Sequence, residues 1–515
     1  MKLLGLRLCE HDSNMSYFDG TKVHYYKSER DYQIKHHGYD ELKTWRGDIQ
    51  RVFNVRPEEI DDIAIVICPW RHNLPKNNEE FFPSINYPFF EADCPVQRIN
   101  HHYAHALSCW PVNDIIPDVE VVIDGHGDYD NTWTVFKNNK VFERGYQQNM
   151  GSIGVEISMA GSWLGIKHDE NSRYDLAGKL MGLQSYGNHI QEFIDFLPDS
   201  IYETRGIFDL QRWFNFMGGE LMGSLRPLDW IRTVHDHVGD VLVKFFESIT
   251  DKNYNSVITY SGGVAQNVIW NTKLKNKFPN LIIPPHCNDE GLSLGAVEYL
   301  RLKHNLPKFK LDNFPYCQSD MSPNGEASED TIRRTVELLK QGKIVGWYQG
   351  RGEIGPRALG HRSLLINPMI KNAKEIINKV KKREAYRPFG ASILKEHAKE
   401  YFNTDIVNPH MLYVGHATKD YLQSITHVDG TCRYQTVDNS NGVYHKLLQQ
   451  FYHDTGCPLL LNTSFNINGK PILGNTTDAM KFFRASDIDA VVIGDIIFDD
   501  ILKIDKQYKN FELDI

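Results

Sequence analysis

The chain has 515 residues and a formal net charge of -9 at pH 7, with 41% hydrophobic and 24% charged residues. This length exceeds what one hydrophobic core usually supports, so two or more domains are expected. The composition is typical of a globular protein, and no run of about 18 apolar residues indicates a membrane span. The acidic balance argues against a protein that coats nucleic acid, although a local basic site is compatible with it.

The first residues and the cysteines predict a cytoplasmic protein. Residues 3–8 form a short apolar run that is typical of a buried strand, and no secretory signal is recognisable around it. The eight cysteines are scattered singly, without a CxxC pair. This spacing argues against a disulfide framework and against a zinc ribbon.

Apolar runs with strand character alternate with helical stretches, which predicts an α/β fold with helices covering the sheets. A segment rich in Pro, Asn, Asp and Ser at 306–328 predicts a linker between a first domain at 1–305 and a second at 329–515. The second domain is expected to begin with a helix over Asp330–Gln341. The sequence contains no internal repeat. The predicted strands after the first are Ile63–Cys68, Val119–Ile123, Ser256–Tyr260, Ile344–Tyr348 and Ala490–Ile493.

A histidine cluster in the segment HHYAHA suggests a metal site. His101 and His105 are four residues apart, and on a helix this spacing places both imidazoles on one face. The same spacing is compatible with a core histidine next to a surface histidine. Asp124, at the end of a predicted strand, and Asp289, in the turn NDEGLSLGA, are carboxylates at positions where α/β folds hold ligands. Two His with one or two Asp, and with open coordination positions, suit divalent iron, manganese or zinc.

Two turns in the first domain have the composition of binding loops. The stretch YSGGVAQN places Gly262 and Gly263 between a strand and a helix, where backbone N–H groups can approach an anion. An ordinary strand-to-helix turn is the alternative, and neither a Walker A motif nor GxGxxG is present. His11 and Asp12 follow the first strand, where a histidine can act as a general base or simply occupy a turn.

The second domain carries arginines in glycine-punctuated loops rather than on a helical face with paired acids. Planar guanidinium groups bind phosphate or carboxylate oxygens with two hydrogen bonds, so these loops predict a pocket for a polyanion. A solvated charged surface is the alternative. The motifs are GRGEIGPRALGHRSLL with Arg351, Arg357 and Arg362; KKREAYRPFG with Lys381, Lys382, Arg383 and Arg387; HVDGTCRYQTV with His427 and Arg433; and NTSFN with Asn462, Ser464 and Asn466.

Taken together and in this order, the motifs resemble those of the nodulation and antibiotic O-carbamoyltransferases. The resemblance also covers DGHGD and GKLMGLQSYG, and it runs through nearly the whole chain. It implies that the first domain has an actin-like ATPase-type fold, similar to threonylcarbamoyl-adenosine synthase, with two related halves around a cleft. It implies that the second domain is YrdC-like, a twisted mixed sheet with a basic cavity.

The resemblance also implies the chemistry. The second domain would use carbamoyl phosphate and ATP with Mg²⁺ to form carbamoyl-adenylate, and the first would transfer the carbamoyl group to an acceptor hydroxyl. His101, His105, Asp124 and Asp289 would bind iron(II) or another divalent metal, and His11 would accept the hydroxyl proton. The remaining substrate-binding residues would be Asp12, Lys179, Gly262, Gly263, Asn267, Arg351, Arg357, Arg362, Lys382, Arg383, Arg387, Arg433, Asn462 and Ser464.

The acceptor is the part of this prediction that the motifs leave open. Ser13-Asn14-Met15-Ser16 stands where the family has smaller, less polar residues, and we interpret the added polarity as an effect on acceptor shape. The aromatic and basic stretch 69–103 is compatible with a natural-product sugar, with a hydroxymethyl pyrimidine nucleotide or nucleic acid, or with a loop that packs on the core. A tRNA-modifying enzyme of the threonylcarbamoyl type and an inactive binding module are the alternative functions. A homodimer is compatible with the sequence.

Overall fold

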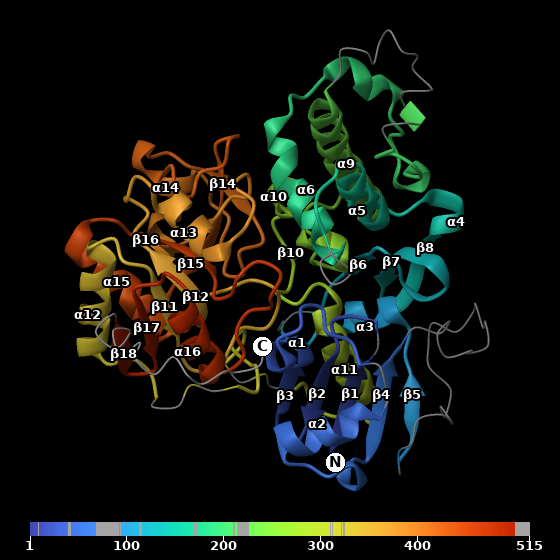
Figure 1. Ribbon diagram of the computed structural model, residues 1–515. Coiled ribbons are helices and arrows are strands. Elements are labelled where there is room, and N and C mark those ends of the chain that lie inside the picture. The colour runs from blue at the N-terminus through green and yellow to red at the C-terminus, as the bar shows by residue number, and fades with distance from the viewer. Residues whose placement is uncertain are drawn as a thin grey trace. The chain divides into compact units, whose positions relative to one another are not determined.

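The computed structural model forms two compact units, and each is described by itself (Figure 1). Unit 1 comprises Met1–Ser319 with Ile354–Pro356 and Leu412–Val414, and unit 2 begins at Asp320 and contains the rest. The first boundary between the two units, between Ser319 and Asp320, lies inside the segment 306–328. The structure describes residues 1–8, 10–39, 43–67, 92, 94–112, 116–168, 173–209, 212–213, 226–309, 311, 313–320, 322 and 325–499.

Unit 1 contains two five-stranded sheets, the first with the strand order β3-β2-β1-β4-β5. The apolar run near the N-terminus forms the central strand β1, whose five residues are all buried. β1 pairs antiparallel with β2 and parallel with β4, β2 pairs antiparallel with β3, and β4 pairs parallel with β5. The strands are β1 (Leu3–Arg7), β2 (Asn14–Phe18), β3 (Val23–Lys27), β4 (Asp62–Val66) and β5 (Val96–Arg98).

The second sheet of unit 1 repeats this topology. Its order is β8-β7-β6-β9-β10, with β6–β7 and β7–β8 antiparallel and β6–β9 and β9–β10 parallel. The two sheets therefore share one strand order and one set of directions, although the sequence contains no repeat. This duplication agrees with two related halves. The strands are β6 (Val119–Ile123), β7 (Asn131–Lys137), β8 (Lys140–Tyr146), β9 (Ile258–Ser261) and β10 (Leu281–Ile282).

Helices α11 and α3 of unit 1 connect the two sheets. Helix α11 packs on β1, β2 and β4 and also against α3, which in turn contacts β6 (Figure 1). A Cβ at Gly295 of α11 would lie 1.8 Å from the carbonyl oxygen of Ala104 in α3, so only glycine permits this close approach. The helices are α1 (Ser28–Tyr32), α2 (Thr44–Phe53), α3 (His101–Ser108), α4 (Gln147–Met150), α5 (Ile153–Trp163), α6 (Leu176–Leu183), α9 (Pro227–Ile249), α10 (Val268–Lys277) and α11 (Leu292–Lys303).

Unit 2 is built on one eight-stranded mixed sheet with the order β14-β15-β13-β16-β12-β11-β17-β18. β11 is parallel to β17 but antiparallel to β12, and β13 is parallel to β15 but antiparallel to β16. The strands are β11 (Val345–Tyr348), β12 (Arg362–Ile366), β13 (Gly390–Leu394), β14 (Val414–His416), β15 (Thr431–Val437), β16 (Leu459–Ser464), β17 (Ala490–Ile493) and β18 (Ile496–Asp499). The helices are α12 (Glu329–Lys340), α13 (Ala373–Lys381), α14 (Ala398–Phe402), α15 (Val443–Thr455) and α16 (Thr476–Ala485).

These elements confirm the predicted α/β class. The strands expected at 119–123 and 490–493 have the predicted bounds, and the helix expected from Asp330 begins one residue earlier, at Glu329. Among the described residues, no helix is both long enough and apolar enough to span a membrane. Most of the stretch 69–103, namely residues 69–91 and 93, lies outside the described residues, and so do parts of 306–328.

Candidate metal centre and anion pocket

Helix α3 carries the two histidines of the predicted metal site. The helix begins at His101 because the side chain of Asn100 caps it, accepting a hydrogen bond from the backbone N–H of Tyr103. All eight residues of α3 are buried. Its histidines therefore lie inside the protein, one helical turn apart and on the same face.

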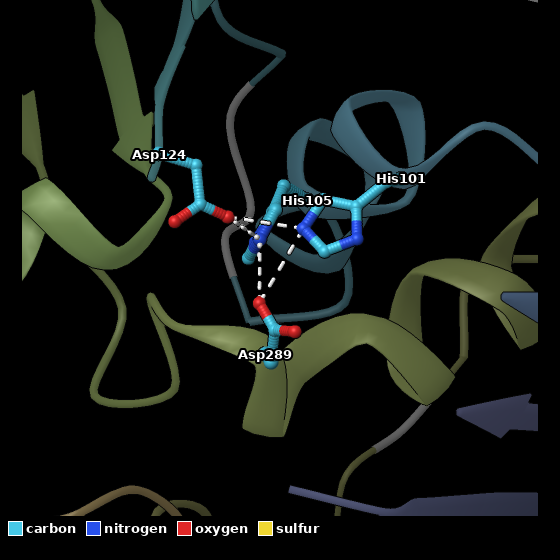
Figure 2. A group of neighbouring side chains, drawn as sticks. All are labelled: His101, His105, Asp124 and Asp289. Atoms are coloured by element: carbon cyan, nitrogen blue, oxygen red, sulfur yellow. Dashed lines mark hydrogen bonds and ion pairs between the residues drawn. The ribbon is translucent and has the colours of Figure 1, made fainter. Parts of the chain in front are cut away.

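Both predicted carboxylates lie against these imidazoles (Figure 2). Asp124 follows β6, and its Oδ2 is 3.0 Å from Nε2 of His101 and 3.2 Å from Nε2 of His105. Asp289 begins a short 3-10 turn before α11, and its Oδ1 is 3.4 Å and 3.3 Å from the same two nitrogens. One ligand atom from each of the four residues lies within 4.8 Å of every other. Two imidazole nitrogens and two carboxylate oxygens fit iron, manganese or zinc better than calcium, which prefers oxygen alone.

The electrostatics of the cluster keep its carboxylates ionised. Burial by itself raises the pKa of Asp289, but His101, His105 and Arg7 outweigh this and hold it well below the usual range. Asp124 is shifted in the same direction by the two histidines. For His101, burial lowers the pKa, but Asp289 and Asp124 raise it to about 10. A metal that binds here therefore displaces a proton from an imidazole and meets two carboxylates already charged.

His11 lies next to this cluster. Its Nδ1 is 2.9 Å from Oδ2 of Asp12, and its Nε2 is 3.8 Å from Oδ2 of Asp289. When Nδ1 donates to Asp12, a neutral imidazole presents the Nε2 lone pair toward the metal cluster. The structure thus gives Asp12, predicted as a substrate ligand, a place behind His11 as the group that orients it.

The glycine turn contacts the metal cluster through Asp124. The backbone N–H of Gly263 donates to Oδ1 of Asp124 at 3.0 Å. Gly262 has a φ of 95°, and a Cβ there would lie 2.2 Å from the carbonyl oxygen of Ile123, so this position requires glycine. Asn267 caps α10 by accepting from the N–H groups of Ile269 and Trp270. A contact between these residues and an adenylate remains a prediction.

Two further polar residues of unit 1 point to other partners. Lys179, on α6, donates to the carbonyl oxygen of Lys167 at 2.9 Å. His102 hydrogen-bonds through Nδ1 to Oγ1 of Thr134 on β7, and burial together with the neighbouring histidines lowers its pKa well below the ordinary value. His102 is therefore a neutral residue directed at β7 and is not one of the four ligands.

Unit 2 gathers four of the predicted arginines. Burial and the positive charges of Arg357, Arg383 and Arg387 lower the pKa of Arg433 well below the ordinary value. Arg383 is shifted in the same direction by burial and by Arg387. Among the described residues, Nε of Arg433 is buried and has no hydrogen-bond partner. Positive groups that repel one another in a partly buried place favour the binding of an anion.

Arg362 has a different surrounding, which revises its predicted role. Its five N–H donors all have partners, namely the Asp320 carboxylate and the carbonyl oxygens of Gln349, Gly350 and His361. The guanidinium also lies 3.5 Å from the centre of the Tyr348 ring. Arg362 therefore has no donor left for a phosphate, and its hydrogen bonds instead stabilise the glycine-rich loop between β11 and β12. The carbonyl oxygen of Arg351 accepts a hydrogen bond from Nδ1 of His361 in the same loop.

Lys382, predicted as a substrate-binding residue, differs in burial from its neighbour Lys381. Lys382 follows the end of α13 and is exposed. Lys381 is buried, and its Nζ donates to Oγ of Ser464 at 3.0 Å and also contacts Asn466. Asn462 donates to Oγ of Ser392 at 2.9 Å and to the carbonyl oxygen of Ala358. The sequence does not show which of two adjacent lysines is buried. In the structure α13 ends at Lys381, whose side chain is buried, and Lys382 is exposed.

Comparison with known proteins identifies the family. Residues 90–297 match the family described as carbamoyltransferase N-terminus, and residues 336–500 match carbamoyltransferase C-terminus. Nodulation protein NolO of Bradyrhizobium diazoefficiens is 30% identical over 446 residues, which cover 77% of this chain and 78% of that protein. Nodulation protein NolNO of Sinorhizobium fredii is 30% identical over 436 residues, 78% of this chain and 63% of that longer protein. The 3'-hydroxymethylcephem-O-carbamoyltransferase of Streptomyces clavuligerus is 29% identical over 340 residues, 63% of this chain and 64% of that enzyme.

The chain therefore belongs to the carbamoyltransferase family. It is a carbamoyltransferase enzyme. Among solved structures, it is similar to HypF of T. kodakarensis, with 14% identity and a TM-score of 0.40 over 60% of this chain and 48% of that chain. It is also similar to E. coli YciO, with 15% identity and a TM-score of 0.25 over 34% of this chain and 90% of that chain.

Proposed function

We propose that this carbamoyltransferase is ATP-dependent and acts on an acceptor hydroxyl. Unit 2, as a YrdC-like unit, forms carbamoyl-adenylate from carbamoyl phosphate and ATP with Mg²⁺. Unit 1, as an actin-like unit, transfers the carbamoyl group to the acceptor. The family membership and the two different polar sites, one in each unit, support this division of labour.

One observation carries the proposal for unit 1. His11, the two histidines of α3 and the glycine turn all lie at the same two carboxylates: His11 Nε2 lies 3.8 Å from Asp289, and the Gly263 N–H donates to Asp124. Group transfer from an adenylate to a hydroxyl needs a proton acceptor, a place for the departing phosphate and positive charge beside it. We assign the proton acceptor to His11 and the positive charge to the metal cluster. The departing phosphate would lie beside the Gly262–Gly263 turn, whose own N–H groups donate to the Cys287 carbonyl oxygen and to Asp124.

The proposed reaction has two steps, formation of carbamoyl-adenylate and transfer of the carbamoyl group to the acceptor. Hydrolysis of carbamoyl phosphate yields carbamate and phosphate, and a carbamate oxygen attacks the α-phosphorus of ATP and releases pyrophosphate. The acceptor oxygen then attacks the carbamoyl carbon of carbamoyl-adenylate, the bond to the AMP oxygen breaks, and the hydroxyl proton goes to Nε2 of His11. Asp12 holds the other nitrogen of that ring and stabilises the imidazolium.

The four ligands and the arginines support these steps by position and charge. When bound, a divalent cation, with iron(II) favoured by the family resemblance, supplies Lewis acidity beside the reacting carbonyl. Arg357, Arg383, Arg387 and Arg433 hold the phosphate groups in unit 2 and offset their charge. A closed site also protects carbamate and its adenylate from water. The acceptor that we propose is a sugar hydroxyl or the hydroxymethyl group of a pyrimidine.

The test uses the full chain and separates the two half-reactions. Wild-type protein is expected to release pyrophosphate from ATP only when carbamoyl phosphate is present, and to add one carbamoyl group to its acceptor, measured by mass spectrometry. Absence of carbamoyl-phosphate-dependent pyrophosphate release with every divalent metal tested would refute the proposed function.

His11→Asn separates proton acceptance from activation. The variant is expected to keep pyrophosphate release but to transfer the carbamoyl group from supplied carbamoyl-adenylate at least about 100-fold more slowly, because a positioned general base contributes a factor of that size. His24→Asn is the matched control, since His24 lies on β3 and pairs with Asp19, which directly follows β2, and neither residue contacts the four residues of the cluster. Full transfer activity in His11→Asn would exclude His11 as the base.

A further inference from the structure

The turn that carries Asp289 is fastened to the first sheet by a row of buried polar side chains. Arg7 is the last residue of β1, Asn14 the first of β2, and Lys27 the last of β3. Arg7 is directly opposite Asn14, and Asn14 is directly opposite Lys27. Residues opposite each other in neighbouring strands lie on the same face of a sheet, so the three side chains form one row.

Each member of this row contacts the turn at Asp289 and Glu290. Nη2 of Arg7 donates to Oδ2 of Asp289 at 3.0 Å. Nδ2 of Asn14 donates to the carbonyl oxygen of Asp289 at 2.9 Å, and its Oδ1 accepts from the N–H of Ser293 at 3.0 Å. Lys27 pairs with Oε1 of Glu290 at 2.6 Å. The turn is therefore held at its side chains and at its backbone.

These contacts correct our interpretation of the polar residues after His11. We expected the polarity of residues 13–16 to shape the acceptor site. The structure shows instead that the side chain of Asn14 is fully buried and bonded to the backbone of Asp12, Asp289 and Ser293. Its role is to join the loop of His11 to the turn of Asp289.

Hydrogen bonds from Arg7 and from two backbone N–H groups decide which oxygen of each carboxylate faces the histidines. Oδ2 of Asp289 is taken by Arg7, so Oδ1 alone faces the two histidines. Oδ1 of Asp124 accepts from the N–H groups of Gly125 and Gly263, at 2.7 and 3.0 Å, so Oδ2 alone faces them. Each carboxylate therefore turns one oxygen toward the histidines and hydrogen-bonds through the other. The four residues would hold a cation through two nitrogens and two oxygens and would leave positions open for substrate.

We propose that Arg7 is a positioning residue of the metal centre: by holding Oδ2 of Asp289 it turns Oδ1 toward the two histidines and favours binding of a cation through that one oxygen. The proposal rests on the metal site of the proposed function. Arg7 is only 1% exposed, so solvent does not compete with Asp289 for its N–H groups. Its Nη2 also contacts Oε2 of Glu10 at 3.4 Å, and the 3.0 Å contact with Asp289 is the shorter of the two. A guanidinium presents its N–H groups in one rigid plane, whereas the ammonium of lysine is a flexible point charge that orients a carboxylate less well.

The test compares Co(II) binding to full-length wild-type, Arg7→Met, Arg7→Lys, Ser16→Ala and His101→Ala proteins. Co(II) is the probe because its visible absorption weakens as its coordination number rises. In Arg7→Met, Asp289 loses the hydrogen bond that orients its carboxylate, so the Kd for Co(II) is expected to rise at least about tenfold. Because Oδ2 is then no longer held by Arg7 and can also bind the ion, the band is expected to weaken. Arg7→Lys keeps the charge and is expected to restore both values in part.

Ser16→Ala is the matched control, because it removes a buried hydrogen bond to Ser293 from the same sheet without touching Asp289. It is expected to bind Co(II) as the wild type does, and His101→Ala is expected to lose binding. A wild-type spectrum and wild-type Kd in Arg7→Met, with binding lost in His101→Ala, would overturn the role of Arg7 and leave the metal site standing. Absence of Co(II) binding by the wild type would overturn the metal site itself.

Discussion

Replacing His105 by alanine is expected to abolish high-affinity metal binding and to lower carbamoyl transfer at least about 1000-fold, or about 4 kcal/mol of transition-state stabilisation. His105 has no exposed surface, and its Nε2 lies between Asp124 and Asp289. Its removal leaves three possible donors, namely the two adjacent carboxylates and the imidazole of His101. Two carboxylates that share so little positive charge repel each other, so the remaining cluster also loses its geometry.

The measurement pairs metal titration with transfer from supplied carbamoyl-adenylate. Pyrophosphate release, which we assign to unit 2, serves as the internal reference and is expected to stay near the wild-type rate in His105→Ala. His189→Ala is the matched control, since His189 is a partly exposed histidine of unit 1 that contacts Asp236. Retention of both metal affinity and transfer in His105→Ala would contradict the four-ligand centre.

Arg433→Met is expected to show the opposite pattern, with carbamoyl-phosphate-dependent pyrophosphate release at least about 100-fold lower and transfer from supplied carbamoyl-adenylate retained. Loss of one charge-assisted contact to a phosphate in a buried place costs about 3 kcal/mol. Arg433 lies among Arg357, Arg383 and Arg387, whose charges disfavour its own. Its removal therefore relieves repulsion in the free protein.

This repulsion adds a second, independent readout. In the absence of ligand, Arg433→Met is expected to have a higher Tm than the wild type, because a binding site that concentrates like charge is held at the expense of stability. Arg333→Met, on the exposed surface of α12, controls for the loss of one positive charge. Unchanged pyrophosphate release together with an unchanged Tm would show that Arg433 belongs to no anion pocket.

The residues of the candidate metal centre could be found from the sequence because their signals are local. The spacing of His101 and His105 places both on one side of a helix whatever the rest of the chain does. Asp124 follows an apolar run that ends in a glycine turn, and such an end is where a sheet exposes polar groups. The order of the motifs supplied the family, and the matches to the carbamoyltransferase N- and C-terminal families agree with it.

The roles within the arginine loops could not be predicted, because they depend on distant partners. Arg362 and Arg433 are the same residue type in similar strings. Only the fold brings Asp320, 42 residues away in sequence, to the guanidinium of Arg362, while Arg433 receives other arginines as neighbours. Likewise, Lys381 and Lys382 are adjacent, and only the end of α13 decides which of them is buried.

Sequence alone therefore determined the α/β class, the family and the four residues of the candidate metal centre. Periodicity and spacing depend on neighbouring residues, and the order of the motifs can be followed along the chain without knowing the fold. The tertiary structure decided which oxygen of each carboxylate faces the histidines and that Arg7, in the run LLGLRL, lies behind Asp289. Arg7 and Asp289 are 282 residues apart and meet only because α11 packs on β1. A charge inside an apolar strand shows that a partner must exist; the packing of the sheet determines which residue that partner is.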